Sequence, residues 1–146
     1  MKWTKGEFAL YDERDRADAE AVRSLLAETY WARGRSLQTV KDTIARCVCF
    51  SLYDGADQIG FARVLTDYAT YGIILDVVIH ERYRGRGLGK WMMECVTNHP
   101  DLASLKQVLW TADADNLYRK CGFFVPENLR FMFKLKESSG AQHEQG

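Results

Sequence analysis

The residues best suited to chemistry lie between Glu81 and Lys90, where glycine and arginine are concentrated. Gly85, Gly87 and Gly89 fall within five residues, and the stretch carries four positive side chains against one negative. It separates an apolar strand pattern from a helical pattern. Glycine lets the backbone approach a ligand closely, and the unpaired N–H groups at a helix start attract anions. The stretch therefore predicts a site for a ligand with several phosphates.

Two common phosphate-binding motifs do not fit this spacing. The dinucleotide fingerprint needs glycine where Lys90 stands. A Walker A loop needs glycine at Arg84 and serine or threonine at Trp91. The spacing Arg84-x-x-Gly87-x-Gly89 instead resembles the [Q/R]-x-x-G-x-[G/A] pyrophosphate loop of the GNAT superfamily of acyl-CoA-dependent N-acetyltransferases. The alternative interpretation is a glycine-rich turn with solvated arginines.

A second segment supports the resemblance. Leu117-Tyr118-Arg119-Lys120-Cys121-Gly122-Phe123 is similar to the Y-x-K-x-G-F segment of the same superfamily. The resemblance implies a small, single-domain N-acetyltransferase in which Tyr118 is the general acid that protonates the leaving thiolate. A phenol with a pKa of about 10 suits a thiol with a pKa of about 8.5. Alternatively, Tyr118 is a core residue with a solvated hydroxyl group.

The resemblance also implies where acetyl-CoA binds as the co-substrate. The main chain of Val77, Val78 and Ile79 would pair with the pantetheine arm like an additional strand. The backbone N–H groups of the following loop would hold the pyrophosphate; the residues concerned are Arg84, Gly85, Arg86, Gly87, Leu88, Gly89 and Lys90. The long side chains among them either reach the 3′-phosphate or lie in solvent.

One position departs from the family pattern. Many members carry an asparagine several residues before the tyrosine, where it bonds the pantetheine, whereas Asn116 stands only two residues before Tyr118. In this chain either Asp113 or Thr111 takes over the bond to the pantetheine, or no residue makes it.

Asp76 interrupts an otherwise apolar strand, and an unpaired buried carboxylate is costly. Our hypothesis gives it a catalytic task, either ordering water or binding the substrate ammonium group. The alternative is a structural carboxylate bonded to the neighbouring strand. For the acceptor site we expect Tyr30, Trp31, Asp67 and Tyr68, since aromatic rings and a carboxylate suit a small cationic amine. Here the alternative is hydrophobic packing at a helix end.

The elements that must position these residues alternate between strand and helix periods. We predict strands over 7–11, 47–53, 59–66, 72–79, 107–111 and 130–135, and helices over 18–30, from Ser36 through Ile44, over 88–98 and over 114–121. This order predicts an α/β fold with a mixed sheet covered by helices. The resemblance implies the GNAT fold, a mostly antiparallel sheet splayed at its fourth strand. Residues 1–136 form the expected domain, and 137–146 a disordered tail.

Composition limits the class of partner. The 146 residues suit one domain, and 20 basic residues balance 20 acidic ones, which argues against nucleic acid or a membrane surface as partner. No secretory signal or zinc spacing is found, and the four cysteines are scattered, so we expect a cytoplasmic protein without a metal. The resemblance allows a homodimer.

The expected reaction is direct transfer of acetyl to the primary amine of a small molecule in a ternary complex. No residue stands in a recognisable nucleophile setting. The alternatives are a non-catalytic acyl-CoA-binding sensor or assembly module, and a nucleotide-binding module of another kind.

Overall fold

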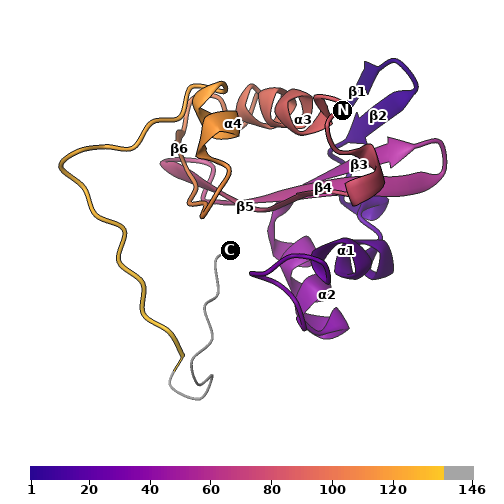
Figure 1. Ribbon diagram of the computed structural model, residues 1–146, viewed down its shortest axis with the longest axis horizontal. Helices are drawn as coiled ribbons and strands as arrows, with labels where there is room; N and C mark the ends of the chain where they lie inside the picture. Colours follow the sequence, from indigo (N-terminus) through magenta and orange to yellow (C-terminus); the bar gives the residue numbers. More distant parts are fainter. Residues whose placement is uncertain (137–146) are drawn as a thin grey trace.

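A six-stranded mixed sheet organises residues 1–136, the part of the chain that the computed structural model describes (Figure 1). Its strands lie in sequence order: β1 (Lys2–Lys5), β2 (Phe8–Tyr11), β3 (Val48–Asp54), β4 (Asp57–Thr66), β5 (Tyr71–Ile79) and β6 (Lys106–Val108). Strands β1 to β5 pair antiparallel with their neighbours, whereas β6 runs parallel to β5.

Helices cover both faces of this sheet, as expected (Figure 1). The first face carries α1 (Ala19–Leu26) and α2 (Leu37–Arg46), and the second carries α3 (Leu88–Thr97) and α4 (Asp115–Arg119). Short 3-10 turns stand at Arg14–Arg16 and Glu81–Tyr83. The caps explain two of the helix starts: Asp18 accepts N–H bonds at the start of α1, and Ser36 does so at the start of α2.

Two apolar cores hold the layers together. Phe50 and Ile74 pack with Met92 and Val96 of α3 on one face. On the other face Phe61 and Val78 pack against α1 and α2. The neighbouring residues Phe61 and Ala62 of β4 serve opposite cores, because successive side chains of a strand point to opposite faces.

The sheet opens at β5, the fourth of the strands predicted from the sequence. Only the first three residues of β5 pair with β6. Within residues 1–136, no strand pairs with that side of β5 from Ile74 onward. The pairing of β4 with β5 also shifts register between Phe61 and Arg63, and Asp76 there takes a φ of 54°. This bulge bends the far half of β5 away from β6.

Three predicted elements differ from those observed, and one observed strand was not predicted. β1 was not expected, since its four residues are mostly polar. The helix predicted over 18–30 ends at Leu26, because the Thr29 hydroxyl and N–H both bond the Leu26 carbonyl and tighten the chain into turns. The predicted strand 107–111 is limited to β6. The strand predicted over 130–135 is wrong for this structure, in which those residues join no sheet. The predicted tail, 137–146, lies outside the described residues.

None of the helices in residues 1–136 has the length and apolar character needed to span a bilayer. In the same residues, no group of three or more histidine, cysteine or acidic side chains is placed to hold a metal ion.

Candidate active site

A cavity of about 690 Å³ opens where β5 and β6 separate. Its walls are the far half of β5, the loop and first turn of α3, the segment from Leu109 to Tyr118, and the turn after α1. This volume lies within the usual range for a small-molecule or cofactor site. Along this opening, β5 offers unpaired main-chain groups to a ligand.

Most of the residues predicted to bind the coenzyme line this cavity. They are Val77, Val78, Ile79, Arg84, Gly85, Gly87, Leu88, Gly89 and Lys90. Arg86 does not line it, and its guanidinium lies 5.2 Å from the centre of the Tyr83 ring. The Arg84 side chain braces the loop, since its Nε donates to the Ile79 carbonyl at 3.1 Å.

The loop backbone has the shape of an anion site. Gly85 and Gly87 take φ values of 79° and 77°, which side-chain-bearing residues rarely adopt. A Cβ at either position would meet nothing within 4 Å, so the space beside the loop is open. Gly87 caps α3 without a side-chain bond, so the first N–H groups of this ten-residue helix have no helical acceptor. The helix dipole adds positive potential there.

Gly89 leaves room for a ligand in a different way. A Cβ there would lie 3.9 Å from both Ile79 and Leu117, which line the cavity from opposite sides. A side chain at position 89 would therefore occupy part of the cavity at the start of α3.

Tyr118 enters the cavity from α4. Its side chain is buried, and burial raises the pKa of its phenol to about 12, with smaller contributions from Cys121 and Asp113. The phenol is therefore protonated and available as a hydrogen-bond donor at neutral pH. The ring of Phe123 packs edge-on at 6.1 Å and fixes the short helix.

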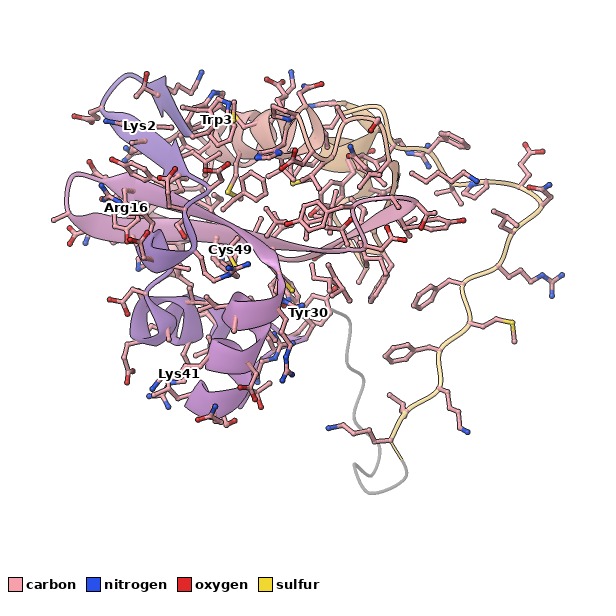
Figure 2. The ribbon with its side chains drawn as sticks, turned by 180° about the vertical axis from the view of Figure 1, so that it is seen from behind. Lys2, Trp3, Arg16, Tyr30, Lys41 and Cys49 are labelled. Atoms are coloured by element: carbon pink, nitrogen blue, oxygen red, sulfur yellow. The ribbon has the colours of Figure 1, made fainter. Side chains whose placement is uncertain are left out.

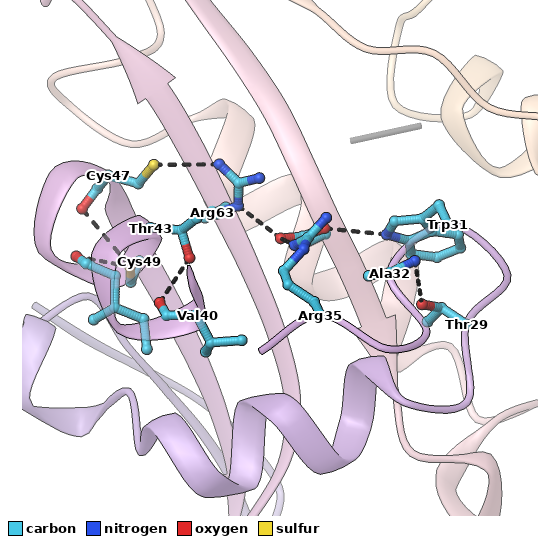
Figure 3. Close-up of polar contacts among 11 residues, drawn as sticks. Thr29, Trp31, Ala32, Arg35, Val40, Thr43, Cys47, Cys49 and Arg63 are labelled. Carbon is cyan, nitrogen blue, oxygen red and sulfur yellow. Dashed lines mark hydrogen bonds and ion pairs between the residues drawn. The ribbon is translucent and has the colours of Figure 1, made fainter. Parts of the chain in front are cut away.

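Asp76 lines the cavity and is buried, with its carboxylate hydrogen-bonded to other side chains. Its carboxylate accepts hydrogen bonds from Arg63 Nε at 2.7 Å, from an Arg35 guanidinium nitrogen at 2.6 Å and from Trp31 Nε1 at 3.1 Å (Figure 3). These three donors occupy both carboxylate oxygens, so little of the carboxylate is left to contact a substrate. The geometry favours the alternative interpretation, a structural carboxylate bonded to the neighbouring strand, with Arg63 as the partner on β4.

Only two of the four residues predicted for the acceptor site line the cavity. Tyr30 and Trp31 line the cavity, with ring centres 5.1 Å apart and planes nearly perpendicular. Asp67 and Tyr68 lie outside it, in the exposed turn between β4 and β5. Asp67 instead caps that turn: it accepts the N–H groups of Ala69 and Thr70 and the Thr70 hydroxyl, and these bonds lower its pKa.

Sequence reasoning missed several cavity residues, among them Glu28, which lies in the turn after α1. Its position within the helix predicted over 18–30 concealed it. Thr111 and Asp113 line the cavity, while Asn116 does not. Three carboxylates therefore line the cavity: those of Glu28, Asp76 and Asp113.

The family model of the GNAT acetyltransferase domain matches residues 45–125, which contain β3 to α4 and hence the glycine-rich loop and Tyr118. A Gibberella zeae protein whose name assigns it to the acetyltransferases is 25% identical over 144 residues, covering 82% of this chain and 80% of that protein.

Two solved structures are similar to this chain. A GNAT-family protein from Xanthomonas campestris pv. campestris superposes with a TM-score of 0.80 at 32% identity, covering 87% of this chain and 93% of that one. A Staphylococcus aureus protein superposes with a TM-score of 0.71 at 20% identity, covering 88% and 98%, and shows the fold alone.

Proposed function

The chain belongs to the GNAT family of acetyl-CoA-dependent N-acetyltransferases, and we propose that its acceptor is the primary amine of a small molecule. Two features that meet in one cavity support this proposal: the start of α3 at Gly87, where the first N–H groups have no helical acceptor, and the protonated phenol of Tyr118. The first suits the pyrophosphate of the coenzyme, and the second suits its leaving sulfur.

The coenzyme supplies the acetyl thioester, and the chain orients it. We assign the pantetheine arm to the open edge of β5 at Val77, Val78 and Ile79. We assign the pyrophosphate to the main-chain N–H groups from Gly85 to Lys90, which would bind it. The guanidinium of Arg86 lies over the Tyr83 ring instead, so in this proposal Arg86 contributes its main-chain N–H alone.

The reaction we propose is direct attack. The bound ammonium group first loses a proton to solvent, and the neutral amine nitrogen then forms a bond to the thioester carbonyl carbon. The C–S bond breaks, the coenzyme leaves as a thiolate, and the nitrogen of the new amide loses its second proton to solvent. A thiol with a pKa of about 8.5 is a stronger acid than the Tyr118 phenol, whose pKa is about 12. Tyr118 therefore donates a hydrogen bond to the sulfur as negative charge develops on it. That bond stabilises the transition state without complete proton transfer.

We assign the acceptor ammonium group to the end of the cavity beside Glu28, Tyr30 and Trp31. A carboxylate and two aromatic rings are suitable contacts for a small organic cation. Asp76 is then a positioning residue: its bond to Trp31 Nε1 fixes the indole that forms part of this end. Asp67 and Tyr68 have no part in the proposal.

We propose that the protein is located in the cytoplasm. All four cysteines are free thiols, as is typical of a reducing compartment.

The direct test is release of free coenzyme thiol from acetyl-CoA, measured across a panel of polyamines, amino acids, amino sugars and peptides. The proposal expects at least one small amine to give turnover that saturates with its concentration. A Glu28→Gln variant should raise the KM for that amine while leaving the affinity for acetyl-CoA unchanged. Binding of acetyl-CoA without turnover on any amine would instead favour a non-catalytic acyl-CoA-binding module.

A further inference from the structure

The cavity continues along β5 past the part that we assign to the pantetheine arm. Beyond Val77 its wall includes Asp76, Leu75 and Ile74. Three residues of strand span about 10 Å. Because the pyrophosphate loop follows Ile79, the arm runs from Ile79 toward Val77, and the acyl group lies in the stretch beyond. The acceptor nitrogen has to reach the acyl carbon there, so whatever limits this stretch also limits the acyl group.

Trp31 stands at this end of the cavity. It lines the cavity together with Asp76, whose carboxylate accepts the Trp31 Nε1 hydrogen bond at 3.1 Å (Figure 3). The Tyr30 ring packs against the indole with centres 5.1 Å apart, and Figure 2 shows Tyr30 at the edge of the layer formed by α1 and α2, next to the sheet. Burial is the main cause of the raised pKa of Tyr118, and Tyr30 adds to it. The two aromatic residues of this wall therefore lie close to the position that we assign to the sulfur.

The segment that carries Trp31 is anchored to the sheet. Arg35 lies in the same connection between α1 and α2, and its guanidinium donates to the Asp76 carboxylate at 2.6 Å. One buried carboxylate of β5 thus holds this connection at two points. Between them the Thr29 hydroxyl accepts the Ala32 N–H at 3.2 Å, which tightens the turn around the indole. A wall held in this way resists displacement by a longer ligand.

The same end of the cavity offers an acyl group an apolar surface. Ile74 and Leu75 are buried apolar side chains. The polar groups beside them already have partners, since the Asp76 carboxylate has three donors and the Thr29 hydroxyl donates to the Leu26 carbonyl at 2.7 Å. A methyl group therefore fits there without leaving a polar group unpaired. Each further methylene that fitted such a surface would raise affinity by up to about fourfold, so size and not polarity excludes a longer chain.

We propose that Trp31 sets the length of the acyl group that the enzyme transfers. Its indole, held by Asp76, leaves room for acetyl and blocks longer acyl groups. Trp31 is then a specificity-determining residue for the coenzyme, in addition to its contact with the acceptor amine. This inference rests on the proposed placement of the coenzyme, with its arm along β5 and its sulfur beside Tyr118.

Binding of a series of acyl-CoA esters tests the proposal without turnover. Isothermal titration calorimetry of the full chain compares acetyl-CoA, butyryl-CoA and hexanoyl-CoA. We expect the wild type to bind hexanoyl-CoA about tenfold more weakly than acetyl-CoA, or weaker still, because the added methylenes meet the fixed indole. In Trp31→Ala this difference should disappear or reverse, since the freed space admits the longer chain. Release of free coenzyme thiol at a saturating amine concentration should show the same change of preference in kcat/KM.

Two further variants complete the comparison. Trp31→Leu keeps more of the apolar packing against the core formed with α1 and α2, so the test does not depend on the folding of Trp31→Ala. This variant should admit butyryl-CoA and bind hexanoyl-CoA with an affinity between those of the wild type and Trp31→Ala. Tyr71→Ala is the matched control: it removes an exposed aromatic side chain from the part of β5 outside the cavity, and it should retain the wild-type preference for acetyl.

The outcomes separate this inference from the proposed function. If no acyl-CoA ester bound, both the coenzyme site and the role of Trp31 would be refuted. If acetyl-CoA bound and was turned over, but the preference for chain length stayed the same in both Trp31 variants, the role of Trp31 alone would be overturned. Equal affinity of the wild type for acetyl-CoA and hexanoyl-CoA would overturn it as well.

Discussion

Arg63 on β4 donates a 2.7 Å hydrogen bond from Nε to the carboxylate of Asp76 on β5, at the point where the pairing of these strands shifts register. Asp76 takes a φ of 54° there, a conformation that costs about 1–2 kcal/mol for a residue with a side chain. The ion pair helps to offset that cost and holds the bulge. Beyond the bulge, β5 leaves β6 and its edge opens into the cavity.

We predict that Asp76→Asn lowers the free energy of unfolding by about 3 kcal/mol or more, because Arg63 and Arg35 then remain buried without their counter-charge. Urea denaturation measures this. Asp57→Asn, an exposed carboxylate on β4, is the control and should change stability by about 0.5 kcal/mol at most. An Asp76→Asn protein with unchanged stability and abolished turnover would instead restore Asp76 as a catalytic residue.

Tyr118→Phe should lower kcat about 100-fold, since the leaving sulfur loses its hydrogen-bond donor. Affinity for acetyl-CoA should stay within about twofold, because the main chain provides most of that binding in our proposal. Steady-state kinetics and calorimetry separate the two quantities. Tyr53→Phe is the control: it removes a hydroxyl that bonds Arg16, outside the cavity, and should leave kcat unchanged. Unchanged turnover in Tyr118→Phe would remove this phenol from the mechanism.

The pKa of Tyr118 gives a separate prediction. Burial raises it from the ordinary 10 to about 12, so the folded state favours the neutral phenol. This contribution to stability is complete below pH 10 and is lost as the pH rises toward 12. Ultraviolet titration of wild type and Tyr118→Phe should differ by one tyrosinate that forms near pH 12. A difference centred at pH 10 would show a solvated hydroxyl group.

Gly87→Val should weaken acetyl-CoA binding at least tenfold, since the new side chain occupies the open space beside the loop. Backbone strain at positive φ also lowers the melting temperature, so a control must carry the same strain. Gly55→Val provides it: Gly55 has a φ of 60° and is equally open, but lies in the turn between β3 and β4. Calorimetry should show lost affinity only in Gly87→Val. Equal affinity in both variants would exclude the loop as the pyrophosphate site.

Sequence patterns predicted those parts of the site whose residues lie close together along the chain. The glycine loop and the start of α3 depend on neighbouring residues, and the helix caps at Asp18 and Ser36 likewise act within four residues. The family resemblance carried by Gly87 and Tyr118 is confirmed by the comparisons. Their individual roles remain proposals.

The sequence is least informative where distant residues decide the outcome. The partners of Asp76 lie 13, 41 and 45 positions away, so its apolar strand gave no sign of them. Asp67 is exposed next to aromatic residues, which suggested a binding role, but its own turn takes up both carboxylate oxygens. A strand pattern over 130–135 indicates an extended segment, whereas pairing requires an edge that the pattern does not identify.

The most direct test of the central claim is a crystal structure of the protein with bound acetyl-CoA. We predict the pyrophosphate oxygens within hydrogen-bond distance of N–H groups between Gly85 and Lys90, the pantetheine along Val77–Ile79, and the sulfur beside the Tyr118 hydroxyl. A coenzyme bound elsewhere, or bound with its sulfur out of reach of Tyr118, would contradict the account.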